Sequence, residues 1–271
     1  MKRFEYEIRK KCLDVALKVG SNGSHLGGGL STVEIFASLY GDILNFDCKK
    51  PFDQHRDRLV VSKGHCVLAY YSVLFLKGFL TKEQLDSFEV NGSHFHGHAT
   101  RNLKNGIEFS GGSLGLGISF AVGQALALKS NNNSAKVYVI IGDGECNEGI
   151  VWEAMMSASH FKLDNLIVII DDNKLQYDGN AKDVLDLISM EHKFNAFGAE
   201  VANVDGHNRG SITSALKNFH EETKPKVLIA DTIKGKGVKF MEGVKEWHHS
   251  ALSLEQYELA MSQIRAYHEI E

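Results

Sequence analysis

The chain has 271 residues, of which 43% are hydrophobic and 24% are charged, a composition typical of a folded protein with a substantial core. Its formal net charge of -4 provides no basic surface for nucleic acid or for an anionic membrane. No apolar run is long enough to cross a bilayer, and the four cysteines form no CxxC pair. We therefore expect a cytoplasmic protein with free thiols. Because no repeat, linker or change in composition divides the sequence, we expect one domain over residues 1–271.

The first half of the chain is predicted to form mainly helices. The expected elements are helices over residues 1–20, 31–44, 64–77 and 114–129, a helix that opens at Thr81, and a short strand over Arg58–Ser62. Ser31 and Glu34 have the spacing of a capping box, and so do Thr81 and Gln84. The first helix has helically spaced apolar residues interrupted by charges, which indicates an amphipathic helix and not a signal peptide.

Two runs rich in β-branched residues predict buried parallel strands in the middle of the chain. They are Lys136–Ile141 and Leu166–Ile170, and the helix expected over Gly149–His160 separates them. A strand, a helix and a strand within about thirty residues form a βαβ unit, whose strands are parallel. The alternation continues with a strand over 199–204, a helix from Ser211, a strand over 225–231, and a closing helix over 253–266 capped by Ser253. We therefore predict an α/β fold with an open parallel sheet and helices on both faces.

Polar side chains follow both central strands. Asp143 lies in a Gly-Asp-Gly loop after the first strand, and Asn173 closes an Asp-Asp-Asn run after the second. Ligands of open α/β sheets bind outside the carboxyl ends of the strands, so the two side chains point into one crevice if the strands are neighbours. Carboxylate, amide and carbonyl oxygens suit Mg²⁺ or Ca²⁺. The helix that begins at Gly149 would add backbone N–H donors for a bound phosphate.

Each loop alone is an ordinary turn, because glycine, aspartate and asparagine are common where strands end. Together with their flanks, however, the two loops resemble the transketolase family of thiamine-diphosphate enzymes. The resemblance is carried, in the family's order and over nearly the whole chain, by GDGECNEG at 142–149, IIDDNKLQ at 169–176, and the stretches 23–28, 62–65, 97–98, 109–117, 231–237 and 247–248.

The resemblance implies a thiamine-diphosphate-binding fold with a defined set of site residues. The ligands of Mg²⁺, with Ca²⁺ or Mn²⁺ as substitutes, would be Asp143, Asn173 and the backbone carbonyl of Leu175. The cofactor would be contacted by His65, Gly112, Leu114, Gly144, Glu148, Asn173, Tyr177 and His248. The catalytic positions would be His25, His98, His248 and Glu148. The implied reaction moves a two-carbon ketol unit from a ketose, expected to be phosphorylated, to an aldose.

The run His94-Phe95-His96-Gly97-His98 also allows a zinc site, because alternate residues share one face of a strand. No nearby cysteine or acidic residue completes a tetrahedron, and Gly97 disfavours a regular strand. His98 is therefore favoured as the substrate-channel residue that the resemblance implies. The histidines without supporting context, interpreted as ordinary surface residues, are His55, His160, His192, His207, His220 and His268.

The sequence departs from the family's pattern mainly on the substrate side. Leu26 stands where the family usually has proline, Ala99-Thr100 replaces a Pro-acid pair, and Ser113 replaces a common proline. These changes leave the metal loop intact, so they put the choice of ketose and aldose in question more than cofactor binding.

In the family, the carboxylate that activates the cofactor comes from a further domain of another subunit. Glu148 lies on the metal loop and does not replace that group. We therefore hypothesise a split transketolase, in which this amino-terminal subunit is completed by a separately encoded carboxy-terminal subunit that supplies the activating glutamate. The expected assembly is a heterotetramer, without nucleic-acid or membrane partners.

Three alternative functions fit parts of the sequence. Another thiamine-diphosphate reaction, such as 2-oxo acid decarboxylation or a deoxyxylulose-phosphate-synthase-like condensation, is disfavoured by the several histidines, which suit a polyol substrate. A non-catalytic cofactor-binding subunit is disfavoured by the intact metal pair. A nicotinamide-dependent oxidoreductase could use the glycines at 27–29, but these follow a helix and have no GxGxxG spacing.

Overall fold

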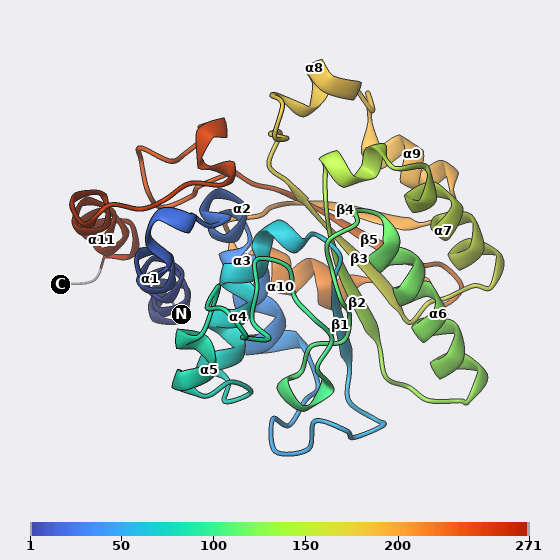
Figure 1. Ribbon diagram of the computed structural model, residues 1–271. Helices are drawn as coiled ribbons and strands as arrows, with labels where there is room; N and C mark the ends of the chain where they lie inside the picture. Colours follow the sequence, from blue (N-terminus) through green and yellow to red (C-terminus); the bar gives the residue numbers. More distant parts are fainter. Residues whose placement is uncertain (1, 270–271) are drawn as a thin grey trace.

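Five parallel strands form one sheet in the computed structural model, which describes residues 2–269 (Figure 1). The strands are β1 (Arg58–Val61), β2 (Val137–Gly142), β3 (Leu166–Asp172), β4 (Glu200–Asp205) and β5 (Lys226–Asp231). Their order is β1-β2-β3-β5-β4, so the two strands that precede the polar loops are neighbours. Gly142 of β2 is in register with Asp171 of β3, and both strands therefore end at the same edge.

Helices cover both faces of the sheet, which confirms the predicted fold class (Figure 1). The helices are α1 (Lys2–Val19), α2 (Leu26–Ser31), α3 (Val33–Ser38), α4 (Val67–Leu76), α5 (Lys82–Asp86), α6 (Leu116–Ser130), α7 (Gly149–His160), α8 (Ala181–Leu185), α9 (Met190–Ala196), α10 (Arg209–Asn218) and α11 (Leu254–His268). Alternate strand residues face opposite ways: Ile140 and Ile169 pack with α1, α3, α4 and α10, whereas Val139 and Val168 pack with α6 and α7. The sheet thus separates two apolar layers.

The predicted capping box at Ser31 and Glu34 is wrong. Ser31 ends α2, and α3 begins after Thr32, whose side chain makes no capping hydrogen bond. Both side chains are buried and bind distant partners instead: Ser31 Oγ donates to Asp171, and Glu34 pairs with Arg9 at 2.7 Å. Buried polar groups must be hydrogen-bonded, and here tertiary partners satisfy that need better than the local backbone does.

Most other predicted elements are confirmed, with small shifts at their ends. Thr81 and Ser253 both cap helices through capping boxes, and α7 has the predicted bounds. The helix expected from Leu114 begins at Leu116, because Gly115 takes a left-handed conformation (φ 83) that ends the preceding loop. All four cysteines are free, as expected.

Among residues 2–269, no helix is both long and apolar enough to cross a membrane. Met1, where the first predicted helix was expected to begin, and the last two residues of the predicted domain lie outside the described residues.

Candidate functional site

Asp143 and Asn173 lie side by side at the carboxyl edge of the sheet, one residue beyond β2 and β3. Both are buried, at 6% and 5% exposure. Among the described residues, Asp143 Oδ2 has no hydrogen-bond partner, although it is shielded from solvent. Burial raises the pKa of Asp143 to about 6, against the attraction of Lys63. A desolvated, unpartnered carboxylate oxygen beside an amide is the donor set expected where a hard cation binds.

The Asn173 amide is held in one orientation by its neighbours. Its Nδ2 donates to Asp171 Oδ2 at 3.1 Å, while its Oδ1 accepts from Leu175 N at 3.1 Å. The Leu175 carbonyl, expected as a third metal ligand, accepts from Lys234 Nζ at 2.9 Å. A carbonyl oxygen has two lone pairs, so this hydrogen bond leaves one of them for a cation. The chain therefore offers a carboxylate oxygen after β2, and an amide oxygen and a carbonyl oxygen after the neighbouring strand β3.

Asp171 is the buried centre of a network beneath this region. It is fully buried and accepts hydrogen bonds from Ser31, Lys63, Asn173 and Thr232. Burial alone would raise the pKa of Asp171, but Lys63 and the two hydroxyls outweigh that effect and lower it. In this network the Asp171 carboxylate balances the charge of the Lys63 ammonium. It also holds the NH₂ group of Asn173 by a hydrogen bond.

Glu145 fixes the other side of the metal loop. One of its carboxylate oxygens accepts from Ser62 Oγ and from Gly115 N, the latter at 2.7 Å. The other oxygen accepts from Gly142 N at 3.2 Å. Burial raises the pKa of Glu145, and these donors oppose the rise. One carboxylate thus ties the loop after β2 to the end of β1 and to the start of α6.

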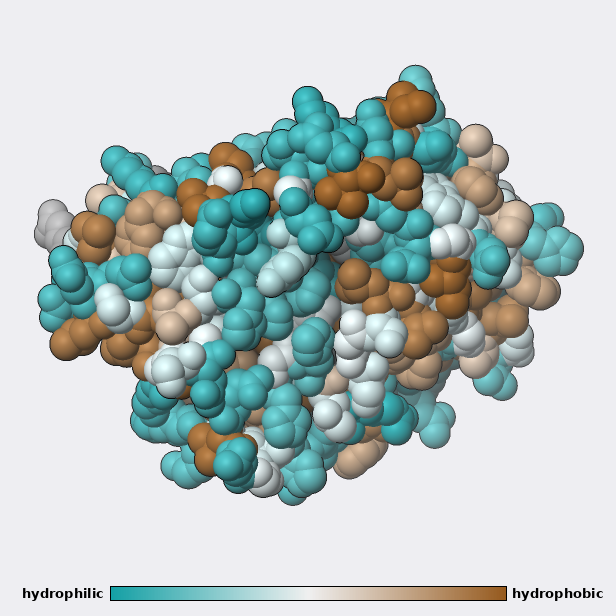
Figure 2. Space-filling model, turned by 45° about the horizontal axis from the view of Figure 1, so that its top comes forward, coloured by the Kyte–Doolittle hydropathy of each residue, from teal (hydrophilic) through white to brown (hydrophobic). Residues whose placement is uncertain are grey.

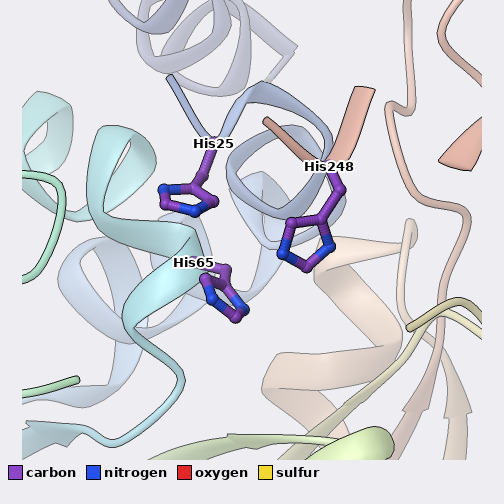
Figure 3. A group of neighbouring side chains, drawn as sticks. All are labelled: His25, His65 and His248. Carbon is purple, nitrogen blue, oxygen red and sulfur yellow. The ribbon is translucent and has the colours of Figure 1, made fainter. Parts of the chain in front are cut away.

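Five imidazoles gather beside the metal loop. The ring centroids of His25 and His65 are 4.7 Å apart, those of His65 and His248 are 4.5 Å apart, and those of His25 and His249 are 4.7 Å apart. His98 is 5.5 Å from His25 and 5.7 Å from His65. Figure 3 shows three of these rings converging from separate segments of the chain. Sequence reasoning selected four of the five and missed His249, which directly follows His248.

Burial and mutual repulsion keep three of these rings, those of His25, His65 and His248, unprotonated. The pKa values of His25, His65 and His248 are lowered to about 3, chiefly by desolvation and then by neighbouring imidazoles and lysines. At neutral pH each ring therefore offers one N–H donor and one lone pair. Negative charge brought close to these three rings would raise their pKa values and so make them better proton acceptors.

Glycines allow the histidine-bearing segments to pack this closely. A Cβ at Gly28 would lie 2.7 Å from the carbonyl oxygen of His65, and one at Gly64 would lie 2.5 Å from Cδ2 of His98. Real Cβ atoms essentially never come so near to other heavy atoms. The glycine-rich stretch around α2 is therefore required for packing, which agrees with the interpretation of glycine clusters as places of close approach.

A cavity of about 150 Å³ joins the metal loop to part of the histidine cluster. The residues expected at the cofactor that line it are Asp143, Asn173, Leu175, Gly144, His65, His248, Leu114 and Tyr177. A larger cavity of about 590 Å³ lies on the other side of Asp143, bordered by Lys174, Leu185 and Ile188. The smaller cavity is the better candidate site, because His65 and His248 line it, whereas no histidine among the described residues lines the larger one.

Three of the expected site residues, Glu148, Gly112 and Tyr177, are exposed. Glu148 is exposed at the N-cap of α7. Gly112 is exposed with φ 137, and a Cβ there would lie 4.0 Å from His98. Tyr177 is 71% exposed, with its ring edge-on to His248 at 5.3 Å. The zinc interpretation of the 94–98 run gains no support, since the three-histidine group that lies close enough for a metal contains none of its residues.

Four buried charged residues at the site were assigned no role from the sequence: Lys63, Glu145, Asp171 and Lys234. Lys234 Nζ lies 3.0 Å from His248 Nδ1, and burial followed by repulsion from Lys63 lowers its pKa to about 8. The sequence did contain a hint that the two lysines belong to the site, because both lie beside glycines within stretches that carry the family resemblance. Charged residues are rarely buried without a function or a partner; all of these have a partner, and Lys63, Glu145 and Lys234 also line the cavity.

The rim of the site leaves apolar surface uncovered. The face shown in Figure 2 is largely hydrophilic, with hydrophobic groups at its left-hand edge and on its right-hand side, where Figure 1 shows α6 and α7. Leu116, Leu185 and Ile188 are exposed at 48%, 55% and 90%. Exposed apolar residues near a functional site often mark a protein–protein contact.

Comparison with known proteins gives consistent matches over nearly the whole chain. A subunit of the apulose-4-phosphate transketolase from Phocaeicola vulgatus is 41% identical over 257 residues, which cover 94% of this chain and 90% of that protein. A 6-deoxy-6-sulfo-D-fructose transketolase subunit from a Clostridium species is 40% identical, covering 95% and 93%. Transketolase from Homo sapiens is 32% identical, but the match covers 94% of this chain and only 41% of that protein.

Solved structures give the same result. Transketolase from Leishmania mexicana matches with a TM-score of 0.88 at 28% identity, covering 100% of this chain and 41% of that one. Transketolase from Campylobacter jejuni matches with a TM-score of 0.87 at 30% identity, covering 100% of this chain and 42% of that one. The family model described as the transketolase thiamine diphosphate binding domain matches residues 2–270. The chain therefore belongs to the transketolase family and corresponds to its thiamine-diphosphate-binding domain.

Proposed function

We propose that this chain is the thiamine-diphosphate- and Mg²⁺-binding subunit of a two-subunit transketolase. With a separate carboxy-terminal subunit it would move a two-carbon ketol unit from a ketose to an aldose. The observation that carries the proposal is the buried carboxylate of Asp143, which has an unpartnered oxygen and faces the same cavity as Asn173 and two neutral histidines.

The metal and diphosphate end of the site belongs to this chain. Asp143, Asn173 and the Leu175 carbonyl would hold Mg²⁺, and the cation in turn would hold the diphosphate. His65 and His248 line the same cavity and would donate N–H groups to phosphate oxygens. Lys234 adds positive charge there.

The chemistry that bound thiamine diphosphate supplies is nucleophilic attack on a ketose carbonyl and withdrawal of electrons from the C–C bond that breaks. The chain's own task is to orient reactants and move protons. His25 and His98 flank His65 and would exchange protons with sugar hydroxyls. The pKa of His25, which burial lowers, would rise once the anionic cofactor and substrate are bound, because negative charge favours the imidazolium form.

A partner subunit would complete the site. Full-length transketolases such as the human protein are matched over only about two fifths of their length, whereas relatives of similar length are named as subunits. Tyr177 and Ile188 are exposed at 71% and 90% beside the two cavities, so a partner that covers them would bury apolar surface and close the site. We propose that residues 1–271 act as one domain in a cytoplasmic heterotetramer, and that the partner supplies the activating glutamate.

The substrate is expected to be a ketose with a terminal anionic group. Two relatives are named for a sugar phosphate and for a sulfonated sugar. Both named sugars end in a strong anion, which favours a related donor here.

The decisive experiment measures ketol transfer with the chain alone and with its carboxy-terminal partner, in Mg²⁺ and thiamine diphosphate. We expect transfer only from the complex. Asp143→Asn should abolish Mg²⁺-dependent cofactor binding, measured by calorimetry, while Asp53→Asn on a distant exposed loop should leave it intact. Full activity from the isolated chain would disprove the partner requirement. Turnover of pyruvate without any ketose would favour a decarboxylase instead.

A further inference from the structure

Three histidines form a compact group of nitrogen ligands at the cofactor cavity. One ring nitrogen from each of His25, His65 and His248 lies within 4.8 Å of the other two. Figure 3 shows that the rings come from three separate segments and point toward one another. Some point lies within about 2.8 Å of all three atoms when they are so spaced, whereas zinc–imidazole bonds are about 2.0–2.1 Å long. Side-chain rotations that draw the three rings together are therefore needed to bring all three nitrogens to bonding distance.

The chemistry of this group differs from that of the metal loop. Imidazole nitrogens suit borderline cations such as Zn²⁺, Co²⁺ and Ni²⁺, whereas the oxygens around Asp143 suit Mg²⁺. A metal ligand must be deprotonated, and burial among like groups keeps these rings neutral. His25 and His65 are partly exposed, which leaves a path for an ion to enter.

We propose that His25, His65 and His248 form a second cation site, selective for a borderline divalent metal such as Zn²⁺, that competes with thiamine diphosphate. His65 and His248 line the same cavity as Asp143, so an ion held by them occupies space that the diphosphate needs. An ion bound to the cofactor-free chain therefore blocks the binding of thiamine diphosphate. Metal binding itself stands independently of the proposed ketol transfer, and only the competition depends on the proposed cofactor site.

Lys234 opposes this site and provides an internal test. Its Nζ lies 3.0 Å from His248 Nδ1, so its positive charge repels a cation and its hydrogen bond occupies one lone pair of the ring. Removing the ammonium in Lys234→Met should therefore tighten metal binding. A lysine that only supported the local structure would have the opposite effect, because its loss would loosen the cluster.

The experiment uses Co²⁺ as a spectroscopic probe with the full chain, free of cofactor. Tetrahedral imidazole ligation gives a strong visible absorption band, whose titration yields the affinity. Each of His25→Ala, His65→Ala and His248→Ala should weaken Co²⁺ binding by at least about tenfold, since even loss of an outer-shell partner costs about 10–100-fold. His160→Ala, at the end of α7, is the matched control and should bind as the unaltered chain does. Urea unfolding midpoints establish that each variant is folded, and His→Asn replacements substitute for any that is not.

The origin of the band is settled by two further measurements. Asp143→Asn removes a hard-oxygen ligand and should leave the Co²⁺ band unchanged. Thiamine diphosphate with excess Mg²⁺ should displace Co²⁺ from the unaltered chain. Unchanged binding in the three histidine variants, or loss of the band in Asp143→Asn, would overturn the proposed site. Failure of the cofactor to displace Co²⁺ would overturn the competition, whereas failure of the proposed function would show separately, as absent ketol transfer by the complex.

Discussion

Asp143→Asn is expected to stabilise the metal-free chain while destroying its metal site. Burial raises the pKa of Asp143 from its usual 3.8 to about 6. At about 1.36 kcal/mol per pKa unit, the charged carboxylate destabilises the folded chain by about 3 kcal/mol relative to the protonated form. Asparagine has a similar shape and carries no charge, so this penalty is absent from the variant.

The pH dependence has a definite sign. Because the folded-state pKa lies above the unfolded one, the stability contributed by protonated Asp143 is complete below about pH 4 and is lost as the pH rises through about 6. The advantage of the variant should therefore grow by about 3 kcal/mol between about pH 4 and about pH 7. Urea unfolding of both proteins at a series of pH values without divalent metal measures this difference, since other titrating groups cancel.

Mg²⁺ and thiamine diphosphate should reverse the order of stability, so that the unaltered chain becomes more stable than Asp143→Asn. With Mg²⁺ and thiamine diphosphate present, the unaltered chain gains stability by mass action, whereas the variant does not. A difference between the two proteins that stays constant with pH would refute the desolvated-carboxylate reasoning. Equal stabilisation of both by Mg²⁺ and cofactor would refute the assignment of Asp143 as a metal ligand.

Two further substitutions test the packing around the site, and a third tests a helix cap outside it. Asp171→Asn should lower the free energy of unfolding in urea by about 3–5 kcal/mol, because Lys63 loses its buried partner. Adding Lys63→Met should recover part of this loss. A loss below about 1 kcal/mol would contradict the buried ion pair. Gly28→Ala places a methyl group 2.7 Å from a backbone carbonyl oxygen and should weaken cofactor binding in calorimetry. Gly29→Ala, with its nearest contact at 3.4 Å, should weaken cofactor binding less. Equal effects of the two substitutions would argue against the close approach of Gly28 to that carbonyl. Ser253→Ala removes the capping box of α11, which does not line the cavity, and should lower stability by about 1 kcal/mol without changing cofactor affinity. Altered affinity would indicate an unexpected coupling.

The fold was predictable because strong local signals agreed with one another. The runs that became β2 and β3 are continuous and apolar, and α7 between them has the predicted bounds. Parallel pairing followed from the strand–helix–strand order alone. The capping box at Ser31 failed because its residues serve tertiary contacts, and a local pattern contains no information about distant partners.

The site was predictable to the extent that its residues follow strand ends. Asp143 and Asn173 meet because parallel strands end at a common edge. The buried network around Asp171 was not predictable, since Ser31, Lys63 and Thr232 come from separate segments and reveal their role only when packed together. The lowered pKa values of the histidines likewise arise from crowding that no sequence spacing reports.

The network around Asp171 has a consequence for how the chain acquires its ligand during synthesis. Asp171 accepts hydrogen bonds from Ser31, 140 residues earlier, and from Thr232, 61 residues later. The loop that orients Asn173 is therefore complete only after β5 has been made and paired. Long-range contacts of this kind form late in folding, because loop closure must precede them. We therefore expect a chain that stops before β5 to bind Mg²⁺ and cofactor more weakly than the complete chain does, because the contacts that orient Asn173 would be missing.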